Sequence, residues 1–249
     1  MLIDHVGYLL LGCGILYILP PGDPRYEMCH FLYRVMRCVG RISFPVYAFL
    51  LTEGIVHTSS WLNYALRLGG FALLSEIPYD LMRVQKPVAF EGQNVFFTLL
   101  IGLLTVKAAE RAAGWIQRWR IHCRGMGEPI YGDGWYLLTW MTAIGLGCVA
   151  AMLLRTDYSS IGVFLIVLLY YFRQEPLKKC AAGFLWMFAA SGRMYYVWGF
   201  GAAFLLIYLY NGEQGSRRGK YAFYLFYPAH ILVLYLIFCW LMERGGMIP

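Results

Sequence analysis

Histidine and carboxylate side chains stand at helical spacings in several apolar parts of this 249-residue chain. Asp4 and His5 open the first apolar run, Glu53 and His57 stand four residues apart, and His230 lies in the last run. An imidazole can take a proton from a nucleophile near neutral pH, and a carboxylate four residues away on a helix can orient it. These residues are therefore candidates for general acid–base catalysis.

Each candidate also has an ordinary structural interpretation. Adjacent helical residues point about 100° apart, so Asp4 is not expected to orient His5, and both suit the polar start of an apolar run. Glu53 and His57 also fit a plain ion pair at a membrane edge. A lone histidine such as His230 is more often a packed polar residue than a catalytic one. The sequence leaves both interpretations open at each position.

Ionised side chains also interrupt the apolar sequence between residues 41 and 98. Each costs about 2.5 to 3.5 kcal/mol at the centre of a bilayer, so these residues must pair with one another or line a cavity. Glu76 and Asp80 share one helix face, with Pro78 between them. We expect this pair to form a structural charge network with Arg67 and Arg41; proton relay and cation binding are the alternatives.

The elements that position these residues follow from composition. Hydrophobic residues make up 60% of the chain and charged residues only 14%, against about 25% in an ordinary soluble domain. We predict an all-α, polytopic transmembrane helix bundle of about nine spans, within a range of eight to ten, that forms one domain over residues 1–249. The apolar runs lie near 3–19, 41–57, 63–82, 94–110, 135–154, 159–172, 181–191, 194–210 and 221–241. The runs 181–191 and 194–210 are so close that they are also compatible with one long kinked span.

The net charge and the cysteine spacing limit the kinds of partner and metal site that the sequence suggests. The formal net charge is +7, and many of the cations fall in the linkers 111–134, 173–180 and 211–220. Under the positive-inside rule these linkers and the N-terminus belong in the cytoplasm, so the charge indicates membrane orientation and no nucleic-acid partner. The seven cysteines show neither a CxxC pair nor zinc-type spacing, so we expect no metal site.

Six segments, in the same order along most of the chain, resemble the TraX family of bacterial conjugal-transfer and chromosomally encoded membrane proteins. They are IDHVG at 3–7, GRISFPVYAFLLTEGIVHT at 40–58, YALRLGGFALLSEIPYDL at 64–81, GQNVFFTLLIGLL at 92–104, LYNGEQG at 209–215 and FYLFYPAHILVLYLI at 223–237. The family is similar, more distantly, to the acyltransferase-3 and heparan-α-glucosaminide acetyltransferase families.

The resemblance implies a multi-helix acyltransferase of the bacterial inner membrane. It would take acetyl from cytoplasmic acetyl-CoA and give it to an acceptor such as a pilin N-terminus, a glycan or another envelope component. His5 falls where the wider superfamily keeps a catalytic histidine at the end of its first helix.

Acetyl transfer from a thioester needs a base, donors for the developing oxyanion and positive charge for the CoA phosphates. We expect His5 to be the base, with His57 and His230 as reserves and with Asp4 and Glu53 as neighbouring carboxylates. The residues expected to meet the oxyanion or the donor are Arg41, Arg67, Asn94, Arg217, Arg218 and Lys220.

Two other classes of function stay open. One is a proton- or cation-coupled secondary transporter that uses Glu53, Glu76 and Asp80 near the midplane, although no internal repeat is visible. The other is a structural subunit of a conjugation apparatus, in which the buried charges only pair helices. Thioester turnover separates the acetyltransferase from both.

Overall fold

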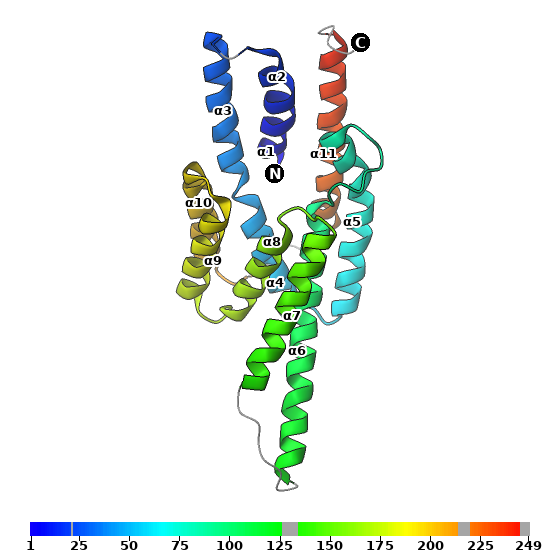
Figure 1. Cartoon of the computed structure of the whole chain (residues 1–249), viewed down its shortest axis with the longest axis vertical. Coiled ribbons are helices and arrows are strands. Elements are labelled where there is room, and N and C mark those ends of the chain that lie inside the picture. Colours follow the sequence, from blue (N-terminus) through cyan, green and yellow to red (C-terminus); the bar gives the residue numbers. More distant parts are fainter. Residues whose placement is uncertain (21, 126–133, 214–219, 245–249) are drawn as a thin grey trace.

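The computed structural model describes residues 1–20, 22–125, 134–213 and 220–244, and these fold as helices joined by short connections (Figure 1). The first helical pass joins α1 (Leu2–Val6), the π-helical η1 (Gly7–Ile15) and α2 (Leu16–Ile18). The elements that follow are α3 (Pro24–Gly40), α4 (Ser43–His57), α5 (Trp61–Val84), α6 (Val95–Gly125), α7 (Gly134–Leu153), α8 (Ser159–Tyr171), α9 (Pro176–Ser191), η2 (Met194–Tyr196), α10 (Val197–Tyr208) and α11 (Lys220–Arg244).

Three stretches of the described chain are long and apolar enough to cross a membrane. They are Pro24–His57, which joins α3 to α4, then Gly134–Leu153 and Tyr221–Arg244. Shorter apolar helices cover Leu2–Ile18, Ser159–Tyr171 and Met194–Tyr208. Large apolar side chains face outward along these and neighbouring helices, as Leu66 and Leu73 do on α5, at 65% and 70% exposed. The chain is a helical membrane protein.

Local sequence explains where the key helices begin. Asp23 accepts a hydrogen bond from the backbone N–H of Arg25 at 2.8 Å, and Pro24 occupies the first position of α3, where its missing N–H costs nothing. Asn94 acts in the same way before α6, because its side-chain oxygen accepts from the N–H of Phe96 at 3.0 Å.

The runs 181–191 and 194–210 are two separate helices, and the alternative of one long kinked span is excluded. The helix α9 ends at Ser191, and Gly192 follows with φ of 61°, a left-handed conformation that suits glycine. The chain reverses there, and α10 packs back against α9. The Gly183 position permits this close packing, because a Cβ there would lie 2.4 Å from the ring of Phe204.

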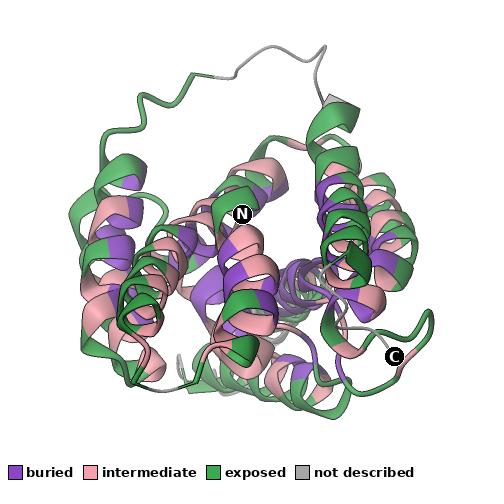
Figure 2. Cartoon of the chain, turned by 90° about the horizontal axis from the view of Figure 1, so that it is seen from above, coloured by how far each residue is buried: buried purple, intermediate pink, exposed green. Residues whose placement is uncertain are grey.

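Successive passes alternate in direction, and buried residues gather on the helix faces that point toward the centre of the bundle (Figure 2). The C-terminal end of α6, the turn from α8 to α9 and the C-terminal end of α10 all lie toward the lower end in Figure 1. These described ends are the ones next to the three basic linkers in the chain; the linker residues 126–133 and 214–219 lie outside the described residues, so their common side of the membrane stays a prediction.

Candidate functional site

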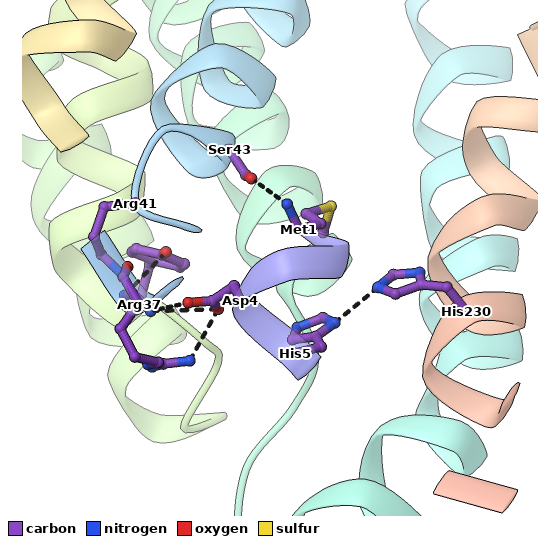
Figure 3. Close-up of polar contacts among 8 residues, drawn as sticks. Met1, Asp4, His5, Arg37, Arg41, Ser43 and His230 are labelled. Carbon is purple, nitrogen blue, oxygen red and sulfur yellow. Dashed lines mark hydrogen bonds and ion pairs between the residues drawn. The ribbon is translucent and has the colours of Figure 1, made fainter. Parts of the chain in front are cut away.

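The first helix carries two polar residues that point in different directions (Figure 3). It packs closely on α3, since a Cβ at Gly40 would lie 2.2 Å from the carboxylate of Asp4 and one at Gly7 would lie 2.9 Å from Cβ of Met36. This packing turns Asp4 toward α3. His5, the next residue, points instead toward α11.

Two arginines at the end of α3 neutralise Asp4. Arg37 Nη1 lies 2.9 Å from Asp4 Oδ2, and Arg41 Nη2 lies 3.3 Å from Asp4 Oδ1. Arg41 also donates from Nη1 to the hydroxyl of Tyr158 at 3.3 Å, and its guanidinium lies 5.1 Å from the ring centre of Tyr196. One carboxylate thus faces two cations, which leaves positive charge in excess beside the first helix.

His5 and His230 are in direct contact although they are 225 positions apart in the chain. His5 Nδ1 lies 2.8 Å from His230 Nε2, and the two rings are stacked. His230 Nδ1 lies 2.5 Å from the carbonyl oxygen of Phe226. A carbonyl can only accept, so Nδ1 of His230 carries the proton and its Nε2 holds a lone pair when the ring is neutral. The hydrogen bond between the rings is then donated by His5 Nδ1, which leaves Nε2 of His5 as a free base.

A cavity of about 320 Å³ opens beside these residues. It is bounded by α1, the junction of α3 and α4, the end of α5 and the loop between α7 and α8. Four arginines and two aspartates line it, so its formal charge is positive, and His5, Tyr8, Tyr79 and Tyr158 add polar groups. The charged members are Arg37, Arg41, Arg83, Arg155, Asp4 and Asp157. Such a lining suits an anionic or strongly polar ligand.

Backbone contacts hold one wall of the cavity. The N–H of Gln93 donates to the carbonyl of Arg155 at 3.1 Å, and the N–H of Asp157 donates to the carbonyl of Gln93 at 2.8 Å. Thr98 donates its hydroxyl to the carbonyl of Asp157 from the first turn of α6. The segment from Arg155 to Tyr158 is therefore fixed to the start of α6.

The structure brings Asp4, His5, Arg41 and His230 together and leaves the other candidates elsewhere. Glu53 and His57 form the pair that their spacing predicted, 3.7 Å apart, but at the far end of α4, about 21 Å from its start at the rise of an α-helix. The His57 side chain is 68% exposed. Arg67 lies against the ring of Tyr64 on α5, and its Nε is buried without a hydrogen-bond partner.

The prediction that Glu76 and Asp80 pair with Arg67 and Arg41 is wrong. Asp80 is buried and accepts from the backbone N–H of Ala89 at 2.7 Å, which anchors the connection that follows α5. Glu76 accepts from the side-chain amide of Asn94. No ion pair joins either carboxylate to an arginine within the described residues. Arg41 pairs with Asp4 instead, and Arg67 lies against Tyr64.

Asn94 is fully buried and donates to the carbonyl of Ala72 at 2.7 Å as well as to Glu76. Its contacts tie α6 to α5, away from the cavity lining. Arg217 and Arg218 lie outside the described residues, and Lys220 is the first residue of α11.

Several residues that line the cavity were not predicted from the sequence. Arg37 had a local signal, because it precedes Arg41 by four residues and so shares its helix face. Arg83, Arg155, Asp157 and Tyr158 had none, since only tertiary packing brings the α7–α8 loop and the end of α5 beside α1.

Comparison with known proteins gives two matches. The family model described as "TraX protein" matches residues 1–238. The "Probable fimbrial assembly protein FimC, serogroup H1" of Dichelobacter nodosus is 25% identical over 256 residues, which cover 94% of this chain and 89% of that protein. No solved structure matches the chain.

Proposed function

Because the chain belongs to the TraX family, we propose that it is a membrane-bound acetyltransferase that uses acetyl-CoA as donor. His5 acts as the general base, and His230 sets its tautomer. The observation that carries this proposal is the chain of contacts from the carbonyl of Phe226 through His230 to His5. It leaves Nε2 unprotonated on His5, a residue that lines a cationic cavity. An oriented imidazole with a free nitrogen is what proton removal from a nucleophile requires.

The reaction proceeds by proton transfer and acyl transfer. The acceptor amine or hydroxyl attacks the thioester carbonyl carbon while its proton passes to Nε2 of His5. The C–S bond then breaks, and His5 returns the proton to the departing thiolate. The products are the acetylated acceptor and the free thiol of CoA.

Arginines of the cavity supply the remaining chemistry. Arg37 and Arg41 line the same cavity as His5 and carry more positive charge than Asp4 neutralises. Such groups stabilise a developing oxyanion and bind phosphate. The earlier prediction that Arg217, Arg218 and Lys220 meet the CoA phosphates stays a prediction, and the cavity arginines form a second candidate set.

The acceptor is proposed from the relative's name. A protein called a fimbrial assembly protein supports a pilin-like subunit as acceptor, and a conjugal-transfer family agrees with it. An envelope glycan is the other acceptor class. Either offers an amine or a hydroxyl, which the proposed base serves equally.

The test is acetyl-CoA turnover by the purified protein beside a His5→Ala variant. General-base catalysis contributes about 10²- to 10⁴-fold, so the variant should lose about that much turnover while it still inserts in the membrane and binds CoA. His57→Ala is the matched control, because it removes an exposed imidazole far from the cavity and should leave turnover unchanged. If His5→Ala keeps more than about a tenth of wild-type turnover, this loss is absent and His5 is not the base.

A coupled transporter is the alternative, and one observation favours it. Glu76 Oε1 is buried without a hydrogen-bond partner, as expected of a carboxylate that binds a transported proton or cation. Ion-coupled uptake into proteoliposomes without thioester turnover would support this alternative.

A further inference from the structure

A second pocket lies on the outer face of the bundle, where α5 begins and α6 passes it. Its volume is about 620 Å³. The residues from α6 recur at three- and four-residue intervals, so they share one helix face. The lining includes Trp61, Lys107, Glu110, Arg111, Trp115 and Arg118.

The pocket carries unneutralised positive charge. Its carboxylate, Glu110, is already engaged by Lys107 Nζ at 2.8 Å and by the hydroxyl of Tyr170. Arg111 and Arg118 are exposed, and within the described residues neither pairs with a carboxylate. The guanidinium of Arg111 lies 4.2 Å from the ring centre of Trp61, which holds it at the pocket.

Apolar surface adjoins this charge. Leu62 and Leu66 lie one and five residues after Trp61 on α5, outside the pocket lining, and are 52% and 65% exposed. Trp115 is 62% exposed on α6. Tryptophan and arginine beside exposed leucines form the pattern of a membrane interface, where a charged head group and acyl chains meet.

The pocket is remote from the cavity that contains His5. Trp61 lines the pocket and Tyr79 lines the cavity. They are 18 positions apart on α5, which corresponds to roughly 27 Å along the helix. A phosphate bound here therefore does not deliver an acyl group to His5. We propose that this pocket binds the phosphate of an anionic phospholipid, with Arg111 and Arg118 as its ligands and the leucines against its acyl chains.

The experiment measures lipid binding to the full chain by native mass spectrometry from micelles that hold equal amounts of phosphatidylglycerol and phosphatidylcholine. Wild-type protein should retain phosphatidylglycerol preferentially. In the double variant Arg111→Gln, Arg118→Gln that preference should fall roughly 25-fold, from a factor of about 5 for each arginine. The variant Arg111→Lys, Arg118→Lys should keep most of it.

Two controls make the result decisive. Arg25→Gln, Arg244→Gln removes the same charge far from the pocket and should leave the preference unchanged. Acetyl-CoA in excess should not displace the lipid. Equal loss in the control variant, unchanged preference in the Arg111 and Arg118 variant, or displacement by acetyl-CoA would each overturn the proposal, and the last would assign the pocket to the donor. The readout is binding, so it stands apart from the test of His5.

Discussion

The second imidazole, His230, decides which nitrogen of His5 can act as a base. His230 Nε2 accepts the proton of His5 Nδ1, and no other hydrogen-bond acceptor contacts that nitrogen within the described residues. His230→Leu removes this acceptor. The tautomer of His5 that acts as base, with its proton on Nδ1, then has a buried donor without a partner and is less stable by about 1 to 3 kcal/mol. We therefore expect kcat to fall by roughly 5- to 150-fold. His230→Gln keeps an acceptor oxygen and should recover most of the loss; equal losses in both variants would show that His230 only fills space.

For single residues, the sequence predicted the direction in which a side chain points better than the residue that it contacts. It predicted that Asp4 and His5 serve different partners, because adjacent helical residues diverge, and Figure 3 confirms this. It did not pair His5 with His230, since a contact between the first and last helices depends on packing rather than on local pattern. Asn94 was expected to meet the oxyanion or the donor; in the structure its amide contacts Ala72 and Glu76 and ties two helices together.

At the scale of elements, the approach of α1 to α3 depends on Gly40. A Cβ there would lie 2.2 Å from Asp4 Oδ1, so Gly40→Ala must push α1 away and separate Asp4 from its arginines. Overpacking of this kind typically lowers the free energy of unfolding by about 1 to 3 kcal/mol. We expect a lower thermal midpoint in detergent and reduced turnover together.

The matched control is Gly70→Ala on α5, where nothing lies within 4 Å of the added Cβ. Alanine favours a helix over glycine by about 0.5 to 1 kcal/mol, so this variant should be as stable as the wild type or slightly more stable. If both substitutions lower the thermal midpoint equally, the contact of Gly40 with Asp4 is not what limits stability.

Most elements were predictable because hydrophobic runs mark them. The run 159–172 matches α8, and 135–154 matches α7, each within two residues. The predicted boundaries differ from the structure where the composition of the chain changes within a continuous helical stretch. The helices α3 and α4 join as one stretch from Pro24 to His57, although its first half is polar enough that sequence placed the span at 41–57. The break between the runs 181–191 and 194–210 was predicted, but the sequence left open whether the chain kinks or reverses there, and Gly192 makes the reversal.

At the scale of the whole molecule, the positive-inside rule applied to the basic linkers sets the expected orientation. The described helix ends next to the basic linkers lie at one end of the bundle, and the connection between α2 and α3 lies at the other. The lining of the cavity that contains His5 includes residues at the C-terminal end of α5 and in the α7–α8 loop. A cytoplasmic basic end would therefore place the cavity toward the opposite side of the bundle, nearer an acceptor outside the cell membrane.

Cysteine labelling tests this orientation. Lys178 adjoins the α8–α9 turn and Arg25 begins α3, and their side chains are 64% and 74% exposed, so a thiol at either position is accessible. Under the positive-inside rule, a membrane-impermeant maleimide should label Arg25→Cys in intact spheroplasts and Lys178→Cys only after the membrane is permeabilised. Wild-type protein with its native cysteines provides the background for both measurements. Labelling of Lys178→Cys from outside, with Arg25→Cys protected, would reverse the molecule in the membrane and place the cavity nearer the cytoplasm.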